Sequence, residues 1–582
     1  MILKRIMVWF AVVGCCFITI SSCKKSKTNP SDGNNPPTED TTTVKPVTDP
    51  TIANTIGFFL NDWQAKTFTA PEYTEATAPT DATTNIVTLD ASSVITKIPR
   101  SITGHNANTW MTPMVTESLF MNHITNLHPH IIRWPAGSGS DAYFWNRQTD
   151  ARPADAPAQL LNSNGELQDA NYWYGKIDNN WSASVDQYYQ MREQSDNEGM
   201  ITVNYGYARY GTSDNPVAAA AHLAADWVRY DNGRTKYWEV GNENFGDWEA
   251  GYRIDVSKNK DGQPEYLTGA LYAQHFKVFA DSMHKAATEI GKTIYVGAVT
   301  YDAESQSWQT NTVKTWNSSM MNALDGKNDF YIVHNYFTPY QTNSNAADIL
   351  NAALSVPAAM MNFVNSEIQK YGAAQKPVAL TEWNMFAIGS KQQVSNTSGL
   401  FSLIVMGELL KNKYGLAARW DLLNGWSNGD DHGLFSDGNE PGIPKWTPRP
   451  SFYYMYFFQK LLGDRLIPTK VSGNINIKAY ASTFSSGQIN ATLINTSGSA
   501  VTIELKTNNF KKGNRFYWYS LEGSNDNGEF SRKVAVNGTS TTLAAGGPSD
   551  YATIKAKSAL TANGIKVIIP AWGAVCMAVD KK

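Results

Sequence analysis

The sequence has 582 residues and a formal net charge of −3. This length accommodates two or three domains with at least one large core. The near-neutral charge argues against a nucleic-acid partner, which requires a basic surface. Only 17% of the residues are charged, whereas 12% are aromatic and 18 are Trp. We expect most of these rings to fill a core and a minority to stack on the apolar faces of a ligand.

The N-terminus has the pattern of an export signal. Two basic residues precede an apolar stretch, residues 7–20, that is too short to span a bilayer comfortably. It ends in Ser-Ser-Cys23, which resembles a bacterial lipobox, where cleavage leaves the cysteine to be lipidated. We therefore predict a lipoprotein signal peptide over 1–23 and an exported protein, at the cell surface or in the periplasm, anchored to the membrane through Cys23. The alternative is an ordinary signal peptide with an incidental cysteine.

The segment 24–50 is rich in Thr, Pro, Asn and Asp, a composition that predicts a flexible tether. Once the signal peptide is removed, Cys23 and Cys576 are the cysteines that remain. An internal disulfide would therefore have to use the anchor cysteine. Cys576 lies in an apolar run, which predicts a small buried side chain in a strand.

The next segment, residues 51–100, is predicted to supply N-terminal strands to a β-sandwich whose other strands lie near the C-terminus. Residues 85–99 alternate apolar and polar side chains in the manner of those strands.

Between residues 101 and 450, short apolar runs alternate with amphipathic helical patterns. One such pattern is 270–291, where apolar residues recur three and four apart before a glycine. The apolar runs are 101–108, 130–137, 200–206, 236–243, 293–299, 329–336, 377–384 and 418–426. Eight strand–helix units predict the α/β class and a closed, parallel (β/α)8 TIM barrel.

The last segment, 451–582, begins with a predicted closing helix near 451–467. Period-two apolar runs follow, separated by turns rich in Gly, Asn and Ser. This pattern predicts an additional C-terminal all-β sandwich, jelly-roll-like in character.

The residues that end the barrel strands are the candidates for chemistry, because the active site of such a barrel lies there. In chain order these residues are Arg133, Asn242, Glu243, His334, Tyr336, Glu382, Trp383 and Trp426. Two carboxylates, Glu243 and Glu382, follow strands four and seven on opposite sides of the ring. Paired carboxylates that face one cavity are what glycoside hydrolysis needs.

The two carboxylates must differ in protonation state at the working pH. Arg133 and Tyr336 are suited to keep Glu382 ionised, which leaves Glu243 as the protonated acid. Asn242 is expected to point its amide toward a sugar hydroxyl. Glu239, two residues before Gly241, is expected to be structural.

The remaining strand-end candidates are predicted to bind substrate. His334 is expected to contact the sugar, with packing at the barrel top as the alternative. Trp383 and Trp426 are expected to stack on sugar rings, with core filling as the alternative.

The motifs "GNE" (241–243), "LTEWN" (380–384), "IIRWPAGSGSDAYFW" and "IVHNYF" resemble the retaining clan A glycoside hydrolases, and within them the family 51 α-L-arabinofuranosidases. The resemblance implies that Glu243 is the acid/base and Glu382 the nucleophile. It also implies that Asn242 is a substrate amide and that Arg133 and Tyr336 brace the nucleophile.

The chain departs from the family 51 pattern at two places. Family 51 usually shows Gly-Gly-Asn after its Arg-x-Pro, where this chain has Ala136-Gly137-Ser138. It also carries a glutamate near the end of the first strand, where this chain has Asn106 and Asn108. Both differences fall on sugar recognition, and neither touches the catalytic pair.

The sequence therefore predicts a retaining hydrolase of plant or algal polysaccharide or oligosaccharide, with α-L-arabinofuranosidase as the specificity that the resemblance implies. The alternatives are a clan A enzyme of endo-glucanase or xylanase type and a non-catalytic glycan-binding lipoprotein. No cofactor and no metal is predicted. His128 and His130 lie at the wrong end of the barrel for a catalytic metal, and a polar loop explains residues 428–432. The oligomeric state is left open.

Overall fold

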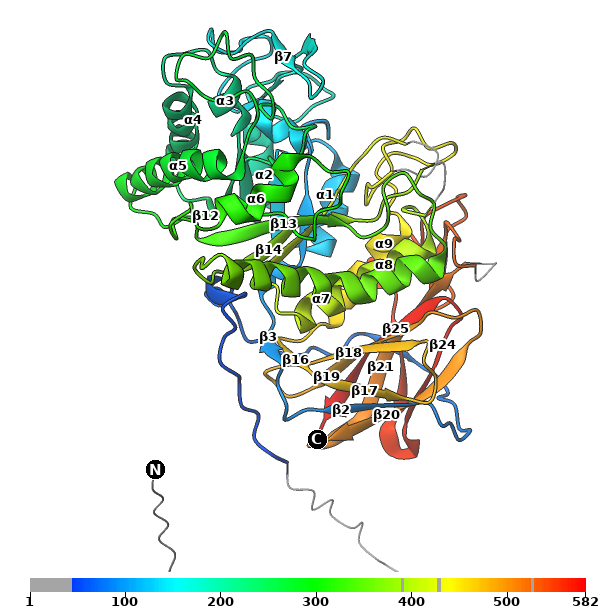
Figure 1. Cartoon of the computed structure of the whole chain (residues 1–582). Helices are drawn as coiled ribbons and strands as arrows, with labels where there is room; N and C mark the ends of the chain where they lie inside the picture. The colour runs from blue at the N-terminus through cyan, green and yellow to red at the C-terminus, as the bar shows by residue number, and fades with distance from the viewer. Residues whose placement is uncertain (1–43, 136, 389–391, 427–430, 525–527) are drawn as a thin grey trace, which may run out of the picture. The chain divides into compact units, whose positions relative to one another are not determined.

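Eight parallel strands close into a barrel in the computed structural model (Figure 1), which describes residues 44–135, 137–388, 392–426, 431–524 and 528–582. The barrel strands are β4 (Gly104–Asn106), β5 (Ile131–Trp134), β10 (Glu198–Val203), β11 (Thr235–Val240), β12 (Tyr295–Val299), β13 (Phe330–Tyr336), β14 (Val378–Asn384) and β15 (Leu416–Arg419). The ring closes where β15 pairs with β4. Each predicted apolar run overlaps one of these strands, so the predicted (β/α)8 barrel is confirmed. Cys23 and the predicted signal peptide lie outside the described residues.

Helices connect the strands in the order that parallel pairing requires. They are α1 (Ser118–Leu127), α2 (Val185–Ser195), α3 (Gly206–Tyr210), α4 (Pro216–Asp231), α5 (Gly269–Glu289), α6 (Asn311–Met320), α7 (Ala346–Lys370), α8 (Asn396–Lys411) and, after the last strand, α9 (Pro450–Leu461). Helix α5 matches the predicted pattern and begins where the Thr268 side chain accepts the Leu271 N–H.

Helix α7 is long and apolar enough to cross a membrane by composition alone. It lies between β13 and β14 in the chain and packs against α8 (Figure 1). Its position is therefore that of a barrel helix, whose apolar side faces the core.

Two further sheets, built mainly from the C-terminal part of the chain, share a hydrophobic core. The nine-stranded sheet contains β1 (Tyr73–Glu75), β3 (Thr96–Lys97), β16 (Arg465–Ile467), β18 (Ile477–Thr483), β19 (Ile489–Asn495), β21 (Lys512–Gly523), β22 (Val534–Val536), β23 (Ala556–Leu560) and β25 (Gly573–Lys581). The four-stranded sheet contains β2 (Ile86–Asp90), β17 (Thr469–Ser472), β20 (Val501–Asn508) and β24 (Ile565–Ile569). Cys576 is fully buried in β25, as predicted, and burial raises the pKa of its thiol to about 12.

Strands that precede the barrel in sequence join both sheets. β2 pairs with β17 and β20, and β1 and β3 pair with β23 and β16. The short helix η1 (Gly57–Leu60) has a different role, which the sequence did not indicate. Phe58 and Phe59 cover the N-terminal ends of the barrel strands, where Phe58 stacks on Tyr295 at 3.8 Å. The aromatic side chains at that end of the barrel require an apolar cover.

The loop after β5 is long and carries its own small elements. These are η3 (Ser138–Ala142), β6 (Tyr143–Phe144), the hairpin of β7 (Gln159–Leu161) and β8 (Leu167–Asp169), and β9 (Trp173–Tyr174). They lie on the face of the barrel where the strands end, because they follow β5 directly in the chain.

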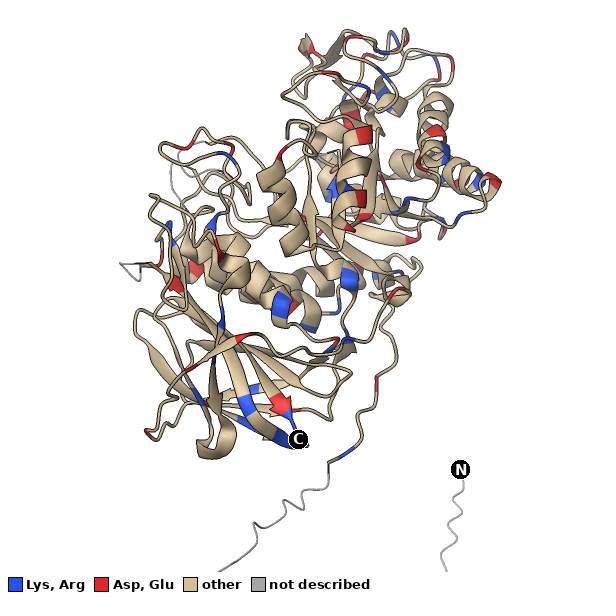
Figure 2. Ribbon diagram, turned by 180° about the vertical axis from the view of Figure 1, so that it is seen from behind, with Lys and Arg blue, Asp and Glu red and all other residues tan. Residues whose placement is uncertain are grey.

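Charged residues are scattered over the fold. In the view of Figure 2, Lys and Arg alternate with Asp and Glu over the barrel helices and the sandwich strands.

Candidate active site

A strained turn presents Glu243 at the end of β11. Gly241 has φ 79° and Glu243 has φ 40°, both in the left-handed region. A Cβ at position 241 would lie 2.0 Å from Oδ1 of Asn244, so the turn requires glycine there. Left-handed backbone at a non-glycine residue costs roughly 1–3 kcal/mol and persists where the surroundings impose it.

Asp141 in η3 imposes this conformation. One of its carboxylate oxygens accepts the Asn242 N–H at 3.2 Å and the Asn244 side-chain amide at 2.7 Å. The other oxygen accepts the N–H groups of Tyr205 and Gly206, both at 3.0 Å. Burial raises the pKa of Asp141 to about 7. The sequence analysis missed this residue, since its only signal is an acid in a Gly/Ser-rich loop after the Arg133 strand.

Arg133 is buried in the barrel and donates to four side chains. Its Nε contacts Oε2 of Glu239 at 2.6 Å, and Nη2 contacts Oδ1 of Asn242 at 2.9 Å. Its Nη1 contacts Oδ1 of Asn106 at 2.8 Å and Oε2 of Glu382 at 3.3 Å. The guanidinium therefore joins β4, β5, β11 and β14 at the level of the active site, and the bracing of Glu382 that the resemblance implied is present.

Glu239 is structural in the described fold, as expected. It is fully buried, and its Oε2 also accepts the Thr202 hydroxyl at 2.6 Å. Burial by itself would raise the pKa of Glu239, but the charges of Arg133 and His334 and the threonine hydrogen bonds together outweigh burial and hold that pKa below its ordinary value.

Glu382 is held at both oxygens. The Tyr336 hydroxyl donates to Oε1 at 2.7 Å, and Nη1 of Arg133 donates to Oε2 at 3.3 Å. Burial nevertheless raises the pKa of Glu382 above its ordinary value, with the charges of His334 and Arg133 opposing it. Arg133 and Tyr336 both lower this pKa, the effect expected of them, but desolvation of the carboxylate and the negative charge of Glu243 outweigh the opposing groups, so the net shift is upward.

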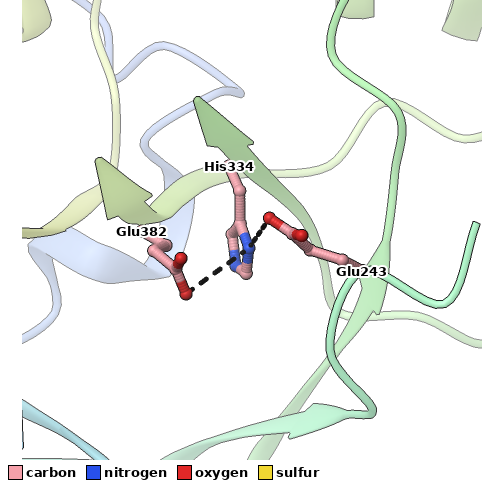
Figure 3. Close-up of side chains that lie close together, drawn as sticks. All are labelled: Glu243, His334 and Glu382. Carbon is pink, nitrogen blue, oxygen red and sulfur yellow. Dashed lines mark hydrogen bonds and ion pairs between the residues drawn. The ribbon is translucent and has the colours of Figure 1, made fainter. Parts of the chain in front are cut away.

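His334 lies between the two carboxylates, as Figure 3 shows. Its Nδ1 is 3.0 Å from Oε1 of Glu243 and 3.8 Å from Oε2 of Glu382, and its Nε2 is 2.9 Å from the Thr381 hydroxyl oxygen. Burial lowers the pKa of His334, but the charge of Glu382 and the hydrogen bond to Glu243 outweigh it, and the net pKa is raised. The positive imidazolium is thus favoured between two acids.

Glu243 is the more open of the two carboxylates. Its side chain is 18% exposed, against 7% for Glu382. Its Oε2 accepts the indole N–H of Trp248 at 3.2 Å. The two acids thus differ in accessibility and in the number of donors that hold them.

Asn242 is oriented by protein contacts at both ends of its amide. Oδ1 accepts from Arg133, and Nδ2 donates to Oε1 of Glu249 at 3.0 Å. The Ser138 hydroxyl donates to the same Glu249 oxygen at 2.6 Å. Burial, together with the charges of Asp141 and Glu243, raises the pKa of Glu249 well above its ordinary value. The contact of Asn242 with a sugar hydroxyl stays a prediction.

The structure places the two tryptophans that were predicted to stack on sugar in different surroundings. Trp383 is fully buried and packs against Phe401 of α8, so the prediction that it stacks on sugar is wrong. Successive strand residues face opposite sides, and since Glu382 faces the barrel interior its neighbour must face the helices. Trp426 lies seven residues after β15 ends, over the guanidinium groups of Arg449 and Arg532 at 5.9 and 5.5 Å. Its stacking on sugar stays a prediction.

Glu243, His334 and Glu382 also form a group whose donor atoms lie close enough to hold a metal ion. Arg133 already donates to Glu382, and its charge opposes a cation at that carboxylate. Acid–base chemistry on a substrate is therefore the better use of the group.

The fold of most of the chain is similar to that of solved glycoside hydrolases. An α-L-arabinofuranosidase from Thermotoga maritima matches with a TM-score of 0.58 at 15% identity, covering 85% of this chain and 99% of its own. A bifunctional glucanase–xylanase from a metagenome library matches with a TM-score of 0.55 at 12% identity, covering 86% and 99%. A family 44 xyloglucanase from Paenibacillus polymyxa matches at 0.53 and 11%, covering 86% and 100%. No family model and no curated protein matches the sequence.

These structural neighbours belong to families 51 and 44, both in clan A, so the resemblance drawn from the strand-end motifs is confirmed at the level of the fold. Identities of 11–15% show a shared architecture.

The ion pair between Arg133 and Glu239 predicts a pH-dependent stability. The folded pKa of Glu239 lies below its unfolded value, so its contribution is present above the unfolded pKa, near 4.3, and is lost as pH falls through the folded pKa. Glu239→Gln should lower the free energy of unfolding at pH 7 by about 3 kcal/mol. The difference from wild type should shrink below pH 4 in urea titrations.

Glu166→Gln, in the exposed β7–β8 hairpin, is the matched control and should leave stability unchanged at every pH. A Glu239→Gln deficit that is equal at pH 7 and pH 3.5 would contradict the role assigned to this ion pair.

Proposed function

We propose that this protein is a retaining glycoside hydrolase. The observation that carries the proposal is the proximity of Glu243 and Glu382, since one oxygen of each and Nδ1 of His334 all lie within 4.8 Å of one another. Retaining enzymes hold their carboxyl groups about 5–5.5 Å apart, whereas inverting enzymes leave about 6.5–9.5 Å for a water. A closest approach this short favours the smaller separation of the carboxyl groups and so supports double displacement.

The contacts of the two acids support their separate roles. Glu382 has a donor on each oxygen, which fixes its orientation as a nucleophile. Glu243 is more exposed and lies beside the indole ring of Trp248, where it can reach a leaving group. The positive charges of Arg133 and His334 favour the ionised form of Glu382.

The reaction then runs in two steps. Glu382 attacks the anomeric carbon while Glu243 gives its proton to the departing oxygen, which leaves a covalent glycosyl ester on Glu382. Glu243, now a carboxylate, takes a proton from water, and the water oxygen displaces Glu382 from the anomeric carbon. Both carboxyl groups return to their starting protonation states.

We propose a plant or algal polysaccharide or oligosaccharide as the substrate. The structural similarity to an α-L-arabinofuranosidase supports an arabinofuranoside. The similarity to a glucanase–xylanase and a xyloglucanase supports a second candidate, cleavage of a glucan or xylan chain.

A hydrolysis screen over arabinan, xylan, glucans and algal polysaccharides, together with aryl glycosides, tests the function. Wild type should release sugar from at least one of them. Glu243→Gln should lower kcat by about 10²–10⁴-fold, the range for loss of a general acid, and Glu382→Gln by at least as much. Glu304→Gln, an exposed acid in the loop after β12, is the control and should retain full activity. If wild type and both variants bind a glycan equally and none cleaves it, the chain is a glycan-binding protein.

We also propose that the protein is exported and anchored by lipid at Cys23, on the strength of the Ser-Ser-Cys pattern after the apolar stretch. Cells fed with labelled palmitate should incorporate label into wild type, and the Cys23→Ala variant should incorporate none and appear in the soluble fraction. Equal membrane association of both forms, without label, would contradict the anchor.

A further inference from the structure

A buried acid, Glu249, closes the loop that carries Glu243 and has no part in the two reaction steps. The Glu249 N–H donates to the Gly246 carbonyl at 3.3 Å, and the Gly246 N–H donates to the Glu243 carbonyl at 2.7 Å. Glu249 is 5% exposed, and its side chain returns to the start of the loop, where Oε1 accepts from the Asn242 amide at 3.0 Å. Both its backbone and its side chain therefore hold the segment that contains Glu243.

The amide of Asn242 has one orientation. Arg133 is solely a donor, so the atom of Asn242 that contacts Nη2 of Arg133 at 2.9 Å is Oδ1. The amide nitrogen then faces Glu249, and Glu249 must accept. Nδ2 carries a second N–H, whose direction is fixed by the contacts with Arg133 and Glu249. Glu249 thus helps to decide where this N–H, next to Glu243, points.

The contacts of Glu249 favour its neutral form. Both of its donors, the Asn242 amide and the Ser138 hydroxyl, contact Oε1. Oε2 is buried, and no donor among the described residues reaches it. An ionised carboxylate would leave that oxygen charged, out of water and without a hydrogen bond, whereas the neutral acid places its proton there.

The charged groups around Glu249 act in the same direction. Asp141 and Glu243 are acids, and their charges add to burial in raising the pKa of Glu249 well above its ordinary value. Arg133 is separated from Glu249 by the Asn242 amide. A cavity adjoins Glu249, and the other titratable residues that line it are Asp169, Asp247, Tyr252 and Arg253. Arg253 is the one cation among these four, and its ion pair is with Glu265.

Asp141 also contacts Asn242, but its surroundings favour the ionised form. Its two oxygens each accept two N–H groups, which come from Asn242, Asn244, Tyr205 and Gly206. Burial raises the pKa of Asp141 as well, and these hydrogen bonds oppose the rise. The fold thus separates the protonation states of the two neighbouring acids, Asp141 and Glu249.

We propose that Glu249 is a positioning residue that works as a neutral carboxylic acid and orients the Asn242 amide beside the acid/base, while Asp141 is the ionised member of the pair and holds the turn. This inference rests on the proposed glycoside hydrolase function. The neutral acid accepts from Asn242 without adding a negative charge beside Glu243. Such a charge would disfavour the carboxylate form of Glu243, which the second step requires.

Matched substitutions test which of the two acids is ionised. In Asp141→Asn, either orientation of the new amide places its NH₂ group against two N–H donors, so the midpoint of urea unfolding at pH 8 should fall. In Glu249→Gln, the carbonyl still accepts from Asn242 and Ser138, so the midpoint should stay at the wild-type value. A fall in Glu249→Gln as large as that in Asp141→Asn would overturn the assignment.

Infrared spectroscopy detects the proton directly and needs no substrate. The difference spectrum between wild type and Glu249→Gln at pH 7 should contain the C=O stretch of a protonated carboxyl group. Glu239→Gln, which removes a buried carboxylate paired with Arg133, is the control and should lack that stretch. Carboxylate bands alone in the Glu249→Gln difference would refute the neutral acid.

Kinetics test the positioning role, on an aryl glycoside that wild type hydrolyses in the screen. Glu249→Met removes the acceptor and should lower kcat/KM about tenfold, the effect of one lost hydrogen bond, and Glu249→Gln should restore most of it. In an Asn242→Ala background Glu249→Met should cost less than about twofold, because its effect passes through that amide. The alkaline limb of the pH–rate profile should stay in place in Glu249→Gln. A limb displaced to lower pH, or losses that add in the double variant, would overturn the inference.

The failure of this inference is distinguishable from failure of the function beneath it. If wild type is active and Glu249→Met is equally active, the positioning role is refuted and the hydrolase stands. If wild type hydrolyses nothing in the screen, the hydrolase is refuted, and the urea and infrared measurements still decide which acid is neutral.

Discussion

A buried guanidinium organises the active site. Arg133 is 1% exposed, and a buried charge without partners is strongly destabilising. Its guanidinium donates hydrogen bonds to four side chains. Glu239 and Glu382 neutralise it, while Asn106 and Asn242 take its remaining donors. Because these partners come from three other strands, the geometry of the site is tied to the closure of the barrel.

The two acids acquire different properties from this arrangement. Glu382 is held by Arg133 and Tyr336 and is nearly closed to solvent, which suits the nucleophile role that we propose for it. Glu243 lies on a left-handed turn fixed by Asp141 and is more open, which suits the acid/base role that we propose for it. His334 contacts both, so its charge couples their protonation.

The sequence predicted the barrel and the proximity of the two strand-end acids because both follow from local patterns. Alternating apolar runs and helical periods define the strand order. Because the ends of the strands converge on one face of the barrel, Glu243, Glu382 and Arg133 could be placed together from the sequence alone. Trp383 could have been excluded by the same logic, since it neighbours Glu382 on a strand and must face the opposite side. Other features depend on three-dimensional packing: the turn anchored by Asp141, the cover formed by Phe58 and Phe59, and the raised pKa of Glu382, which reflects burial that no local pattern reports.

The central claim is that Glu382 forms a covalent bond to the sugar. Removing the acid/base as Glu243→Ala and supplying a dinitrophenyl glycoside, whose leaving group needs no proton, lets the first step proceed and slows the second. Mass spectrometry of the digested protein should find the mass of one glycosyl group on the peptide that contains Glu382. A sugar released with inverted configuration and no adduct on that peptide would contradict the account.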